Sequence, residues 1–469
     1  MLFSDMPGDE GLPGRQRRLA MIAVMLTTAM TVFDASMVNV ALPQIARAMN
    51  VRASEIIWVS NGYLLAAAMT LAIFASLAPR VGYRVQYACG LLVFTLSSLG
   101  CALSETPHML IAMRILQGIG AAATLSIGPA VLRSVFPNRL LGRILGMNAL
   151  LVASGTAIAP LLGGTLLSAF SWQWLFAINL PPGILAIILA MRVLPERTKK
   201  VTGPFDIRGA FLSAIVPGGL IMAADSFALH GGQSLPAEAL LHAAGFLILA
   251  VGAGVTFIFC EKRAANPLLP LTIFSSSRFS LAALTSMSSF ISQGITFIAL
   301  PFLFQNVYGY SAFVSALLFT PWPVGIILAA PHAGRLSDRF PPALISTTGL
   351  GIFVAGLVLL ATLPEHASVA DICLRSLVCG IGFGCFQSPN NREMLSNVAR
   401  ENSSYASGTL AIMRMFGQCM GSAAIGVILA LFSQNDLHSE SHAVHIALWV
   451  AVASCLIAIT VSISRIRRA

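Results

Sequence analysis

The feature that most constrains this chain is the length of its apolar runs. Fourteen windows of roughly 20 residues carry almost no charge, and a helix of that length crosses the hydrocarbon core of a bilayer. The windows are 19–42, 57–78, 86–104, 108–131, 143–167, 174–193, 207–226, 238–260, 279–303, 312–331, 343–362, 370–388, 407–431 and 443–464. Membrane-spanning β-strands are excluded, because they alternate apolar and polar residues over about ten positions. The pattern predicts an all-α polytopic membrane protein with 14 transmembrane helices.

The distribution of charge predicts the orientation of these helices. Only 10% of the 469 residues are charged, whereas a soluble protein carries about 25%. If the N-terminus is inside, 23 of the 28 Lys and Arg residues fall in cytoplasmic segments, and only Arg47 and Arg52 fall in outer loops. This positive-inside bias predicts that both termini are cytoplasmic. It also explains the net charge of +10 without a nucleic-acid partner.

Two longer connectors divide the windows into groups. Residues 194–206 and 261–278 flank two windows, with six windows before them and six after. Repeated halves are common in secondary transporters. The predicted parts are a cytoplasmic tail (1–18), an N-terminal six-helix bundle (19–193), a cytoplasmic linker (194–206), an inserted helix pair (207–260), a second linker (261–278), a C-terminal six-helix bundle (279–464) and a cytoplasmic tail (465–469).

One acidic residue lies deep in the first window. Asp34 is about eight residues from the outer end of its helix, or roughly 12 Å deep at 1.5 Å per residue. Ionisable side chains at such depth are costly and usually face a cavity or one another. Arg114 in the fourth window is about six residues, or roughly 9 Å, from the outer end. Arg114 is therefore the candidate partner of Asp34.

Two interpretations of this pair stay open. Asp34 and Arg114 could form a static ion pair that holds two helices together. Alternatively, Asp34 is a proton-binding site, because a desolvated carboxylate that is only sometimes paired can exchange a proton near neutral pH, whereas arginine stays charged. In that case Asp34 carries the proton and Arg114 promotes its release.

The fifth window carries a stripe of small residues. In ASGTAIAPLLGG, Gly155, Ala159 and Gly163 recur every four residues, a spacing that permits close contact between helices. Pro160 lacks an amide N–H and favours a bend in the same helix. Ordinary membrane packing also uses such stripes, so this one does not identify a function by itself.

Four motifs, in order, resemble those of one transporter family. They are FDASMVNVALP (33–43), RILQGIGAAA (114–123), GTAIAPLLGG (155–164) and WQWLFAINLPPG (172–183). Over essentially its whole length the chain is similar to the major facilitator superfamily, and within it to the fourteen-span drug:proton antiporters. The resemblance implies the major facilitator fold, with two six-helix bundles plus an inserted helix pair. It also implies proton coupling through Asp34 and Arg114, and an antiporter motif that marks exporters, formed by Gly155, Ala159, Pro160, Gly163 and Gly164.

The turns after the second and tenth windows depart from the family pattern Gly-x-Leu-x-Asp-Arg-x-Gly. The first copy has Ala75 in place of the first glycine and Pro79 in place of the aspartate. The second copy keeps Gly334, Asp338 and Arg339. In the family this aspartate is thought to hold the cytoplasmic side shut. The resemblance therefore assigns the cytoplasmic gate turn to the second copy.

The function implied is a proton-coupled antiporter that exports amphipathic, often cationic, toxic compounds by alternating access, as in multidrug or quaternary ammonium efflux. The tenth window lacks the second acid of exporters for divalent cations, which leaves lipophilic monovalent cations open. Aromatic faces suit cations and methionine adapts to varied shapes. On that basis the candidate cavity residues are Phe33, Met37, Trp58, Asn61, Tyr63 and Gln117. Two alternatives are a secondary transporter of one physiological solute, such as an amino acid, siderophore or metabolite, and a membrane receptor that transports nothing.

The sequence carries no pattern typical of an enzyme. The eight histidines are scattered mainly through connectors and window ends, without a nucleophile or metal-ligand constellation. We therefore expect no catalytic residue, no metal and no cofactor. The expected location is the bacterial inner (cytoplasmic) membrane, where the protein is a multi-pass monomer. Its expected partners are protons, small amphipathic or cationic substrates and the lipid bilayer.

Overall fold

The computed structural model describes residues 11–195, 205–229, 237–264, 267–337, 339–364, 367–398, 403–432 and 437–466. Within these ranges the regular elements are all helical. Thirteen helices or helix pairs are long and apolar enough to cross a membrane, and α7 is a further helix of 32 residues. The prediction of an all-α polytopic membrane protein is confirmed. Helices are favoured in lipid because a helix pairs its own backbone N–H and C=O groups where no water is present.

The described residues of the first half form nine helices. They are α1 (Gly14–Met49), α2 (Ala53–Ile56), α3 (Trp58–Val81), α4 (Tyr83–Ala102), α5 (Pro107–Leu125), α6 (Gly128–Val135), α7 (Asn138–Ala169), α8 (Trp174–Ala177) and α9 (Leu180–Val193). Two helices follow, α10 (Ile207–Leu229) and α11 (Ala237–Arg263).

The second half begins with a short 3-10 helix. Its elements are η1 (Leu271–Ser275), α12 (Ser277–Phe302), the π-helical turn η2 (Leu303–Val307), α13 (Ala312–Phe319), α14 (Pro321–Leu336), α15 (Pro342–Ala361), α16 (Val369–Ser396), α17 (Ser403–Phe432) and α18 (Leu437–Ile466).

The helices extend beyond the apolar windows and sometimes divide them. The window 19–42 is the middle of α1, which continues to Met49, and the window 108–131 is divided between α5 and α6. An apolar window marks only the part of a helix suited to lipid. Polar first and last turns keep the same backbone hydrogen bonds, so the helix continues past the window.

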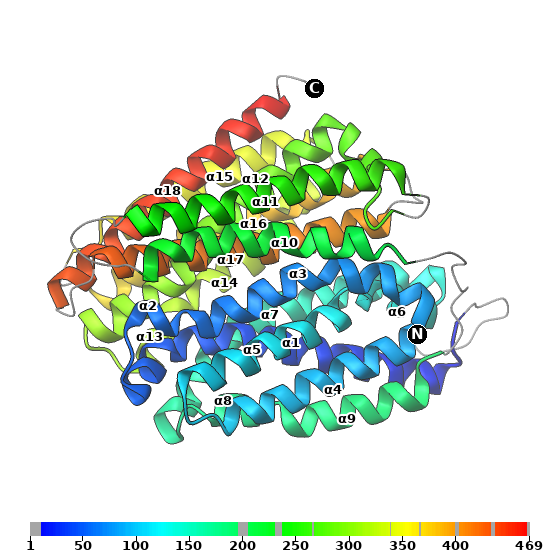
Figure 1. Cartoon of the computed structure of the whole chain (residues 1–469), viewed down its shortest axis with the longest axis horizontal. Coiled ribbons are helices and arrows are strands. Elements are labelled where there is room, and N and C mark those ends of the chain that lie inside the picture. Colours follow the sequence, from blue (N-terminus) through cyan, green and yellow to red (C-terminus); the bar gives the residue numbers. More distant parts are fainter. Residues whose placement is uncertain are drawn as a thin grey trace.

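The helices of each half pack mainly on one another. The blue to blue-green helices α1–α9 lie mainly on one side of the view in Figure 1, and α12–α18 lie mainly on the other. Contacts within the first half join α1 to α7 and α3 to α5, and contacts within the second join α15 to α16 and α12 to α17. Helix α10 packs on α11 and also touches α3 and α17, so it lies along the boundary between the halves.

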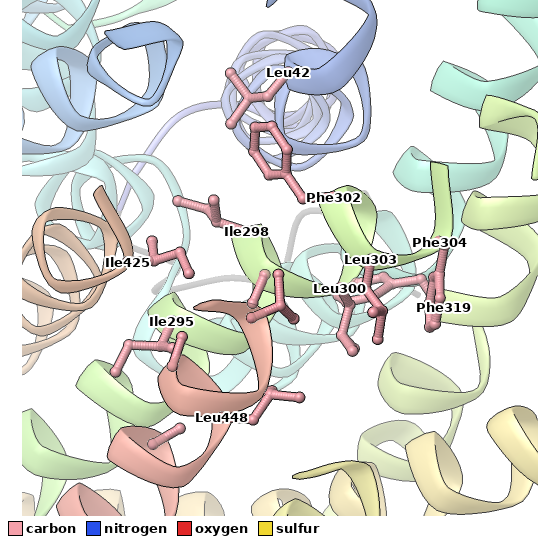
Figure 2. Packing of buried hydrophobic residues seen from close by; sticks show 14 of the residues in the cluster. Leu42, Ile295, Ile298, Leu300, Phe302, Leu303, Phe304, Phe319, Ile425 and Leu448 are labelled. Atoms are coloured by element: carbon pink, nitrogen blue, oxygen red, sulfur yellow. The ribbon is translucent and has the colours of Figure 1, made fainter. Parts of the chain in front are cut away.

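The halves are joined by apolar contacts near the Met49 end of α1. Leu42 of α1 faces Phe302 of α12 in Figure 2, and both side chains are fully buried. They belong to one apolar cluster that contains residues of both halves. Next to them the Gln305 side-chain amide donates to the Val40 carbonyl oxygen over 2.7 Å. This end of the interface is therefore sealed by packing and by a hydrogen bond.

The opposite end, near Gly14, is built differently. One apolar cluster there joins Val24 to Val131 and Ile144, all in the first half. Another joins Phe279 to Met394, both in the second half. Neither of these clusters, as the described residues define them, contains a residue of the other half. The two clusters nearest Gly14 are thus separate, whereas the halves share apolar packing at the Met49 end and also between α3 and α17, where Tyr63 and Leu71 belong to one cluster with Met415 and Cys419.

Candidate functional site

Asp34 lies at the centre of a buried polar network in the first half. Its side chain is 0% exposed. Its Oδ2 accepts a hydrogen bond from the Arg114 guanidinium over 2.5 Å. Its Oδ1 accepts from the Gln117 amide at 2.9 Å and from the Asn179 amide at 3.0 Å. Both carboxylate oxygens are therefore bonded, and the contact expected between Asp34 and Arg114 is present.

Arg114 is held in place by groups of three helices. Its Nε donates to the Val59 carbonyl oxygen over 2.9 Å, and its Nη1 donates to Gln117 Oε1 over 2.6 Å. The guanidinium carbon lies 4.4 Å from the centroid of the Tyr63 ring and 5.7 Å from that of Phe176. Cations bind favourably over such aromatic faces. The arginine is thus charged, 1% exposed and bonded to neutral acceptors as well as to the acid.

Gln117 has one amide orientation that satisfies the network. Its Nε2 donates both to Asp34 and to Ser98 Oγ, the latter over 2.8 Å, while its Oε1 accepts from Arg114. The i to i+3 spacing of Arg114 and Gln117 places both side chains on one face of α5. A sequence pattern of Arg-x-x-Gln therefore builds two members of the network with one helix.

Asn179 is a member that the sequence analysis did not assign. It is the N-cap residue of α9, in the short connection from α8, and it is 3% exposed. It belongs to the WQWLFAINLPPG motif and is the polar residue that interrupts a run of apolar ones. That interruption was the available signal, because a buried amide needs a hydrogen-bond partner.

A cavity of about 540 Å³ lies between the two halves, next to this network. Drug-sized molecules occupy pockets of about 300–1,000 Å³. Tyr63 and Arg114 line the cavity, whereas Asp34 is not among the described lining residues. The polar lining side chains are Thr31, Ser36, Asn39, Ser60, Tyr63, Arg114, Thr156, Gln293, Gln387, Ser388, Asn391, Arg414 and Gln418. Arg114 therefore lies between Asp34 and the cavity: it pairs with the acid and, with Tyr63, lines the cavity.

The six candidate cavity residues have different positions. Tyr63 lines the cavity, and Gln117 is buried behind it in the Asp34 network. The remaining four, Phe33, Met37, Trp58 and Asn61, are not among the described lining residues. The Trp58 indole N–H donates to Asp225 Oδ1 of α10 over 2.8 Å. Direct contact of any of the six with substrate stays a prediction.

Asn61 and Met37 instead take part in helix packing. The Cys419 thiol of α17 lies 3.0 Å from Asn61 Oδ1, so this contact joins the two halves. Met37 is 2% exposed and packs against Gly163 of α7, where an added Cβ would lie 3.1 Å from the Met37 Cβ. The close approach of α1 and α7 therefore depends on a residue without a side chain at position 163.

The other residues of the antiporter motif face several neighbours of α7. An added Cβ on Gly155 would lie 3.1 Å from Val32 of α1, and one on Gly164 would lie 2.9 Å from the Ala312 carbonyl of α13. Ala159 is fully buried, and Pro160 lies inside the helix. The motif thus packs against α1 of its own half and against α13 of the other. Its role in antiport stays a prediction.

Only part of the predicted cytoplasmic gate turn can be placed. Asp338 lies outside the described residues. Gly334 lies in the last turn of α14, and the backbone N–H of Arg339 donates to the Leu336 carbonyl over 3.0 Å. The gate role assigned to these residues stays a prediction.

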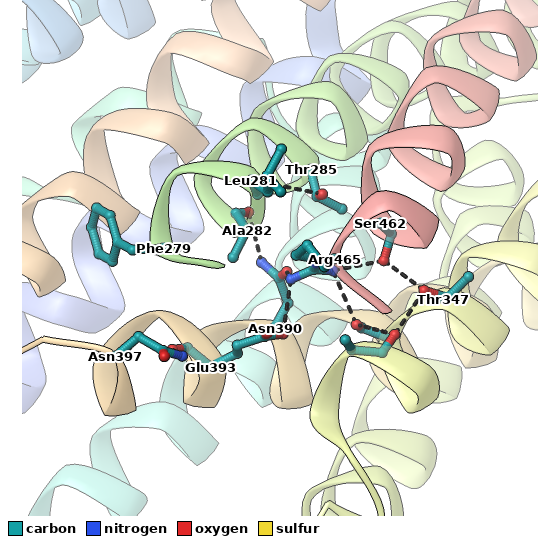
Figure 3. A network of polar contacts seen from close by, with 12 residues as sticks. Phe279, Leu281, Ala282, Thr285, Thr347, Asn390, Glu393, Asn397, Ser462 and Arg465 are labelled. Carbon is teal, nitrogen blue, oxygen red and sulfur yellow. Dashed lines mark hydrogen bonds and ion pairs between the residues drawn. The ribbon is translucent and has the colours of Figure 1, made fainter. Parts of the chain in front are cut away.

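A second buried network lies in the other half. Arg465 of α18 donates to Glu393 Oε2 over 3.0 Å and to Asn390 Oδ1 over 2.8 Å, both in α16. It also donates to Ser462 and to Ser346, and Figure 3 shows these groups between α15, α16 and α18. From the sequence, Arg465 was expected in a cytoplasmic tail, because the apolar window ends at 464. In the structure α18 continues to Ile466, and Arg465 is 1% exposed.

The sequence is similar to those of known membrane transporters. Residues 24–422 match the family model of the Major Facilitator Superfamily. The uncharacterized transporter YebQ of Escherichia coli K12 is 39% identical over 98% of each chain. The multidrug resistance protein Stp of Mycobacterium tuberculosis is 31% identical over 90% of this chain and 78% of its own. The riboflavin transporter RibZ of Clostridioides difficile is 27% identical over 97% of this chain and 98% of its own.

The fold has a solved counterpart of low sequence identity. A bacterial homologue of the human lysosomal transporter Spinster superposes with a TM-score of 0.68 at 15% identity, over 95% of this chain and 96% of that one. At this identity the likeness concerns the fold alone. Together with the family match over most of the chain, the paired halves and the central cavity, it leads to one conclusion: the chain belongs to the Major Facilitator Superfamily and is a transporter.

Proposed function

We propose that the protein is a proton-coupled antiporter that exports amphipathic compounds from the cytoplasm across a bacterial inner membrane. The observation that carries this proposal is the buried ion pair of Asp34 and Arg114 directly behind a cavity between the two halves. A carboxylate in such a position can bind one proton per cycle. Its partner Arg114 lines the cavity, so a change in the charge of Asp34 reaches the space that a substrate would occupy.

The contacts between the halves support a direction for this cavity. Apolar packing joins the halves near Met49, while separate cores lie near Gly14. If the Gly14 end is cytoplasmic, as the distribution of Lys and Arg predicts, this state receives substrate from the inside. Rocking of the two halves would then break the packing around Leu42 and Phe302 and expose the cavity outside.

Proton transfer supplies the coupling between inward and outward states. With Asp34 ionised, the charges of Asp34 and Arg114 compensate each other in a water-poor site. Protonation of Asp34 from the outside leaves Arg114 without a counterion, which disfavours the present arrangement of the network. Release of the proton to the cytoplasm restores the ion pair. Proton entry is thus coupled to the exit of substrate.

Toxic compounds are the proposed substrates. Relatives at this level of identity include the multidrug resistance protein Stp, and 540 Å³ is room for a drug-sized molecule. The second candidate is transport of a single physiological solute. The polar side chains along the cavity favour it, and RibZ, named a riboflavin transporter, is similar over nearly its whole length.

Efflux from cells tests the proposal. We would measure accumulation of ethidium and of anilinonaphthalenesulfonate, with and without an uncoupler, for wild type, Asp34→Asn and Asp371→Asn. Asp371 is the matched control, because this acid is paired with Arg375 at 2.9 Å and is partly exposed, away from the cavity. We expect Asp34→Asn to abolish export per folded molecule and Asp371→Asn to retain it.

Efflux that is insensitive to the uncoupler, or full efflux by Asp34→Asn, would refute proton coupling at this site. A broad profile of exported compounds supports multidrug export, and a single exported solute supports the second candidate.

A further inference from the structure

Arg414 is the cation of the cavity that has no acid beside it. It lies in α17 of the second half, lines the cavity and is partly exposed to it. Arg114, the other lining arginine, is compensated by Asp34. For Arg414, by contrast, no hydrogen bond or ion pair to another described residue exists.

The described lining residues offer Arg414 no compensating carboxylate. Among the described residues that line it, none is Asp or Glu. A guanidinium taken partly out of water without a partner is unfavourable. The site therefore has one uncompensated positive charge, and a substrate that carries one negative charge would neutralise it.

Amide groups supply further donors in the same cavity. Gln387 and Asn391 of α16 and Gln293 of α12 line it. The Gln418 amide donates to Gln293 Oε1 over 3.0 Å, a contact that does not use the Gln293 NH₂ group. Hydrogen bonds from a guanidinium and from amides to an oxyanion are charge-assisted and stronger than neutral ones. A carboxylate, sulfonate or phenolate suits this donor set.

Aromatic side chains of the second half provide an apolar surface for the rest of the ligand. Phe290, Phe297 and Phe383 line the cavity. The rings of Phe290 and Phe383 pack edge to face with centroids 5.4 Å apart. Such a surface binds a flat or apolar body, and it lies in the same half of the protein as Arg414.

We propose that the cavity binds amphipathic monoanions, with an aromatic or apolar body against these phenylalanines and one oxyanion group at Arg414. This inference rests on the proposed export function and specifies its substrate class. The expectation of cationic substrates came from the family resemblance, with Asp34 as the acid of the site. In the structure that carboxylate is 0% exposed and already bonded to Arg114, Gln117 and Asn179, so in this state it offers no free site to a cation.

Binding to the purified full chain in lipid nanodiscs tests the proposal. The probes are anilinonaphthalenesulfonate, an aromatic monoanion, and N-phenyl-1-naphthylamine, the same body without the sulfonate. Probe fluorescence is compared with that of empty nanodiscs. We expect Arg414→Gln to weaken sulfonate binding about tenfold or more, the size expected for a lost charge-assisted contact. Binding of the neutral probe should stay within about twofold, since only the charge is removed.

Two further variants complete the test. Arg414→Lys keeps the charge without the planar fork and should retain an intermediate sulfonate affinity. Arg375→Gln removes one positive charge from a pair at the end of α16, away from the cavity, and should bind both probes as wild type does. If sulfonate affinity is unchanged in Arg414→Gln, or if both probes weaken equally, the proposal is wrong.

The outcome stays decisive if Arg414→Gln does not fold. Wild type is then compared with the two probes and with a quaternary ammonium derivative of the same naphthyl body. Tighter binding of the cation than of the sulfonate would overturn the proposal. Because this assay measures binding without a proton gradient, its failure is distinct from a failure of proton coupling in the efflux experiment.

Discussion

Replacing Arg114 by methionine leaves Asp34 buried without its counterion. The carboxylate keeps the amide donors of Gln117 and Asn179 but loses the guanidinium at 2.5 Å. Removing one partner of a buried ion pair destabilises a protein by about 3–5 kcal/mol. A carboxyl group can escape this cost by binding a proton. We therefore expect the full destabilisation at pH 8 and a much smaller one at pH 5.

The reverse substitution has a different pH dependence. Asp34→Asn leaves Arg114 charged at any accessible pH, because a guanidinium does not release its proton. The stability of this variant should therefore lack the pH dependence that Asp34 gives to Arg114→Met, because asparagine binds no proton. The double variant Asp34→Asn with Arg114→Met buries no charge, so at pH 8 it should be more stable than either single variant.

Tryptophan emission during heating measures these effects. Trp322 is fully buried and packs edge to face on Phe297 and Phe353, at centroid distances of 5.3 and 5.5 Å, so unfolding transfers it to a polar environment. Arg375→Met is the control. Its ion pair with Asp371 is partly exposed, so it should cost less than about 1 kcal/mol without pH dependence. Equal destabilisation of Arg114→Met at both pH values would refute the reasoning, as would a double variant as unstable as the two single effects combined.

Three further substitutions test the packing. Gly118→Val adds a Cβ where α5 meets the Tyr63 carbonyl of α3. The yield of monodisperse protein in size-exclusion chromatography should therefore fall sharply. The control is Gly128→Val, where an added Cβ meets nothing within 4 Å. Glu393→Ala leaves Arg465 buried without its acid and should reduce stability by about 3–5 kcal/mol, measured by the same tryptophan scan; an unchanged unfolding temperature contradicts it. Phe302→Ala empties a fully buried site between the halves and should reduce stability by about 3–5 kcal/mol. In a Leu42→Cys background the same substitution should speed labelling of the new cysteine. An unchanged labelling rate would contradict the inference that packing around Leu42 and Phe302 closes this end.

The number and type of the long helices and the meeting of Asp34 with Arg114 could be predicted from residue spacing. A helix rises 1.5 Å per residue, so counting from the ends of two windows places both side chains at similar depth. The Asp371–Arg375 pair, observed at 2.9 Å, was predictable for the same reason, because residues four apart share one face of a helix. These inferences succeed where the geometry of a single helix determines the answer.

Other features depend on how helices are rotated and packed against one another. Asn179 reaches Asp34 only because the start of α9 lies against α1. The Glu393–Arg465 pair joins two helices whose ends the apolar windows placed in the cytoplasm. Spacing along one chain does not report the rotation of a helix about its axis, and a window ends at the first polar residues whether or not a neighbouring helix buries them.

By itself, then, the sequence determined the membrane-spanning helical class, because only long apolar helices satisfy their backbone in lipid, and it determined the depth of the one acid near the middle of the first helix. The tertiary structure decided what surrounds that acid and what faces the cavity. It buried Asp34 under Arg114, Gln117 and Asn179, and it turned Arg414 towards the cavity. Side-chain exposure depends on packing between helices, so the substrate class that we propose follows from the cavity and not from the motif around Asp34.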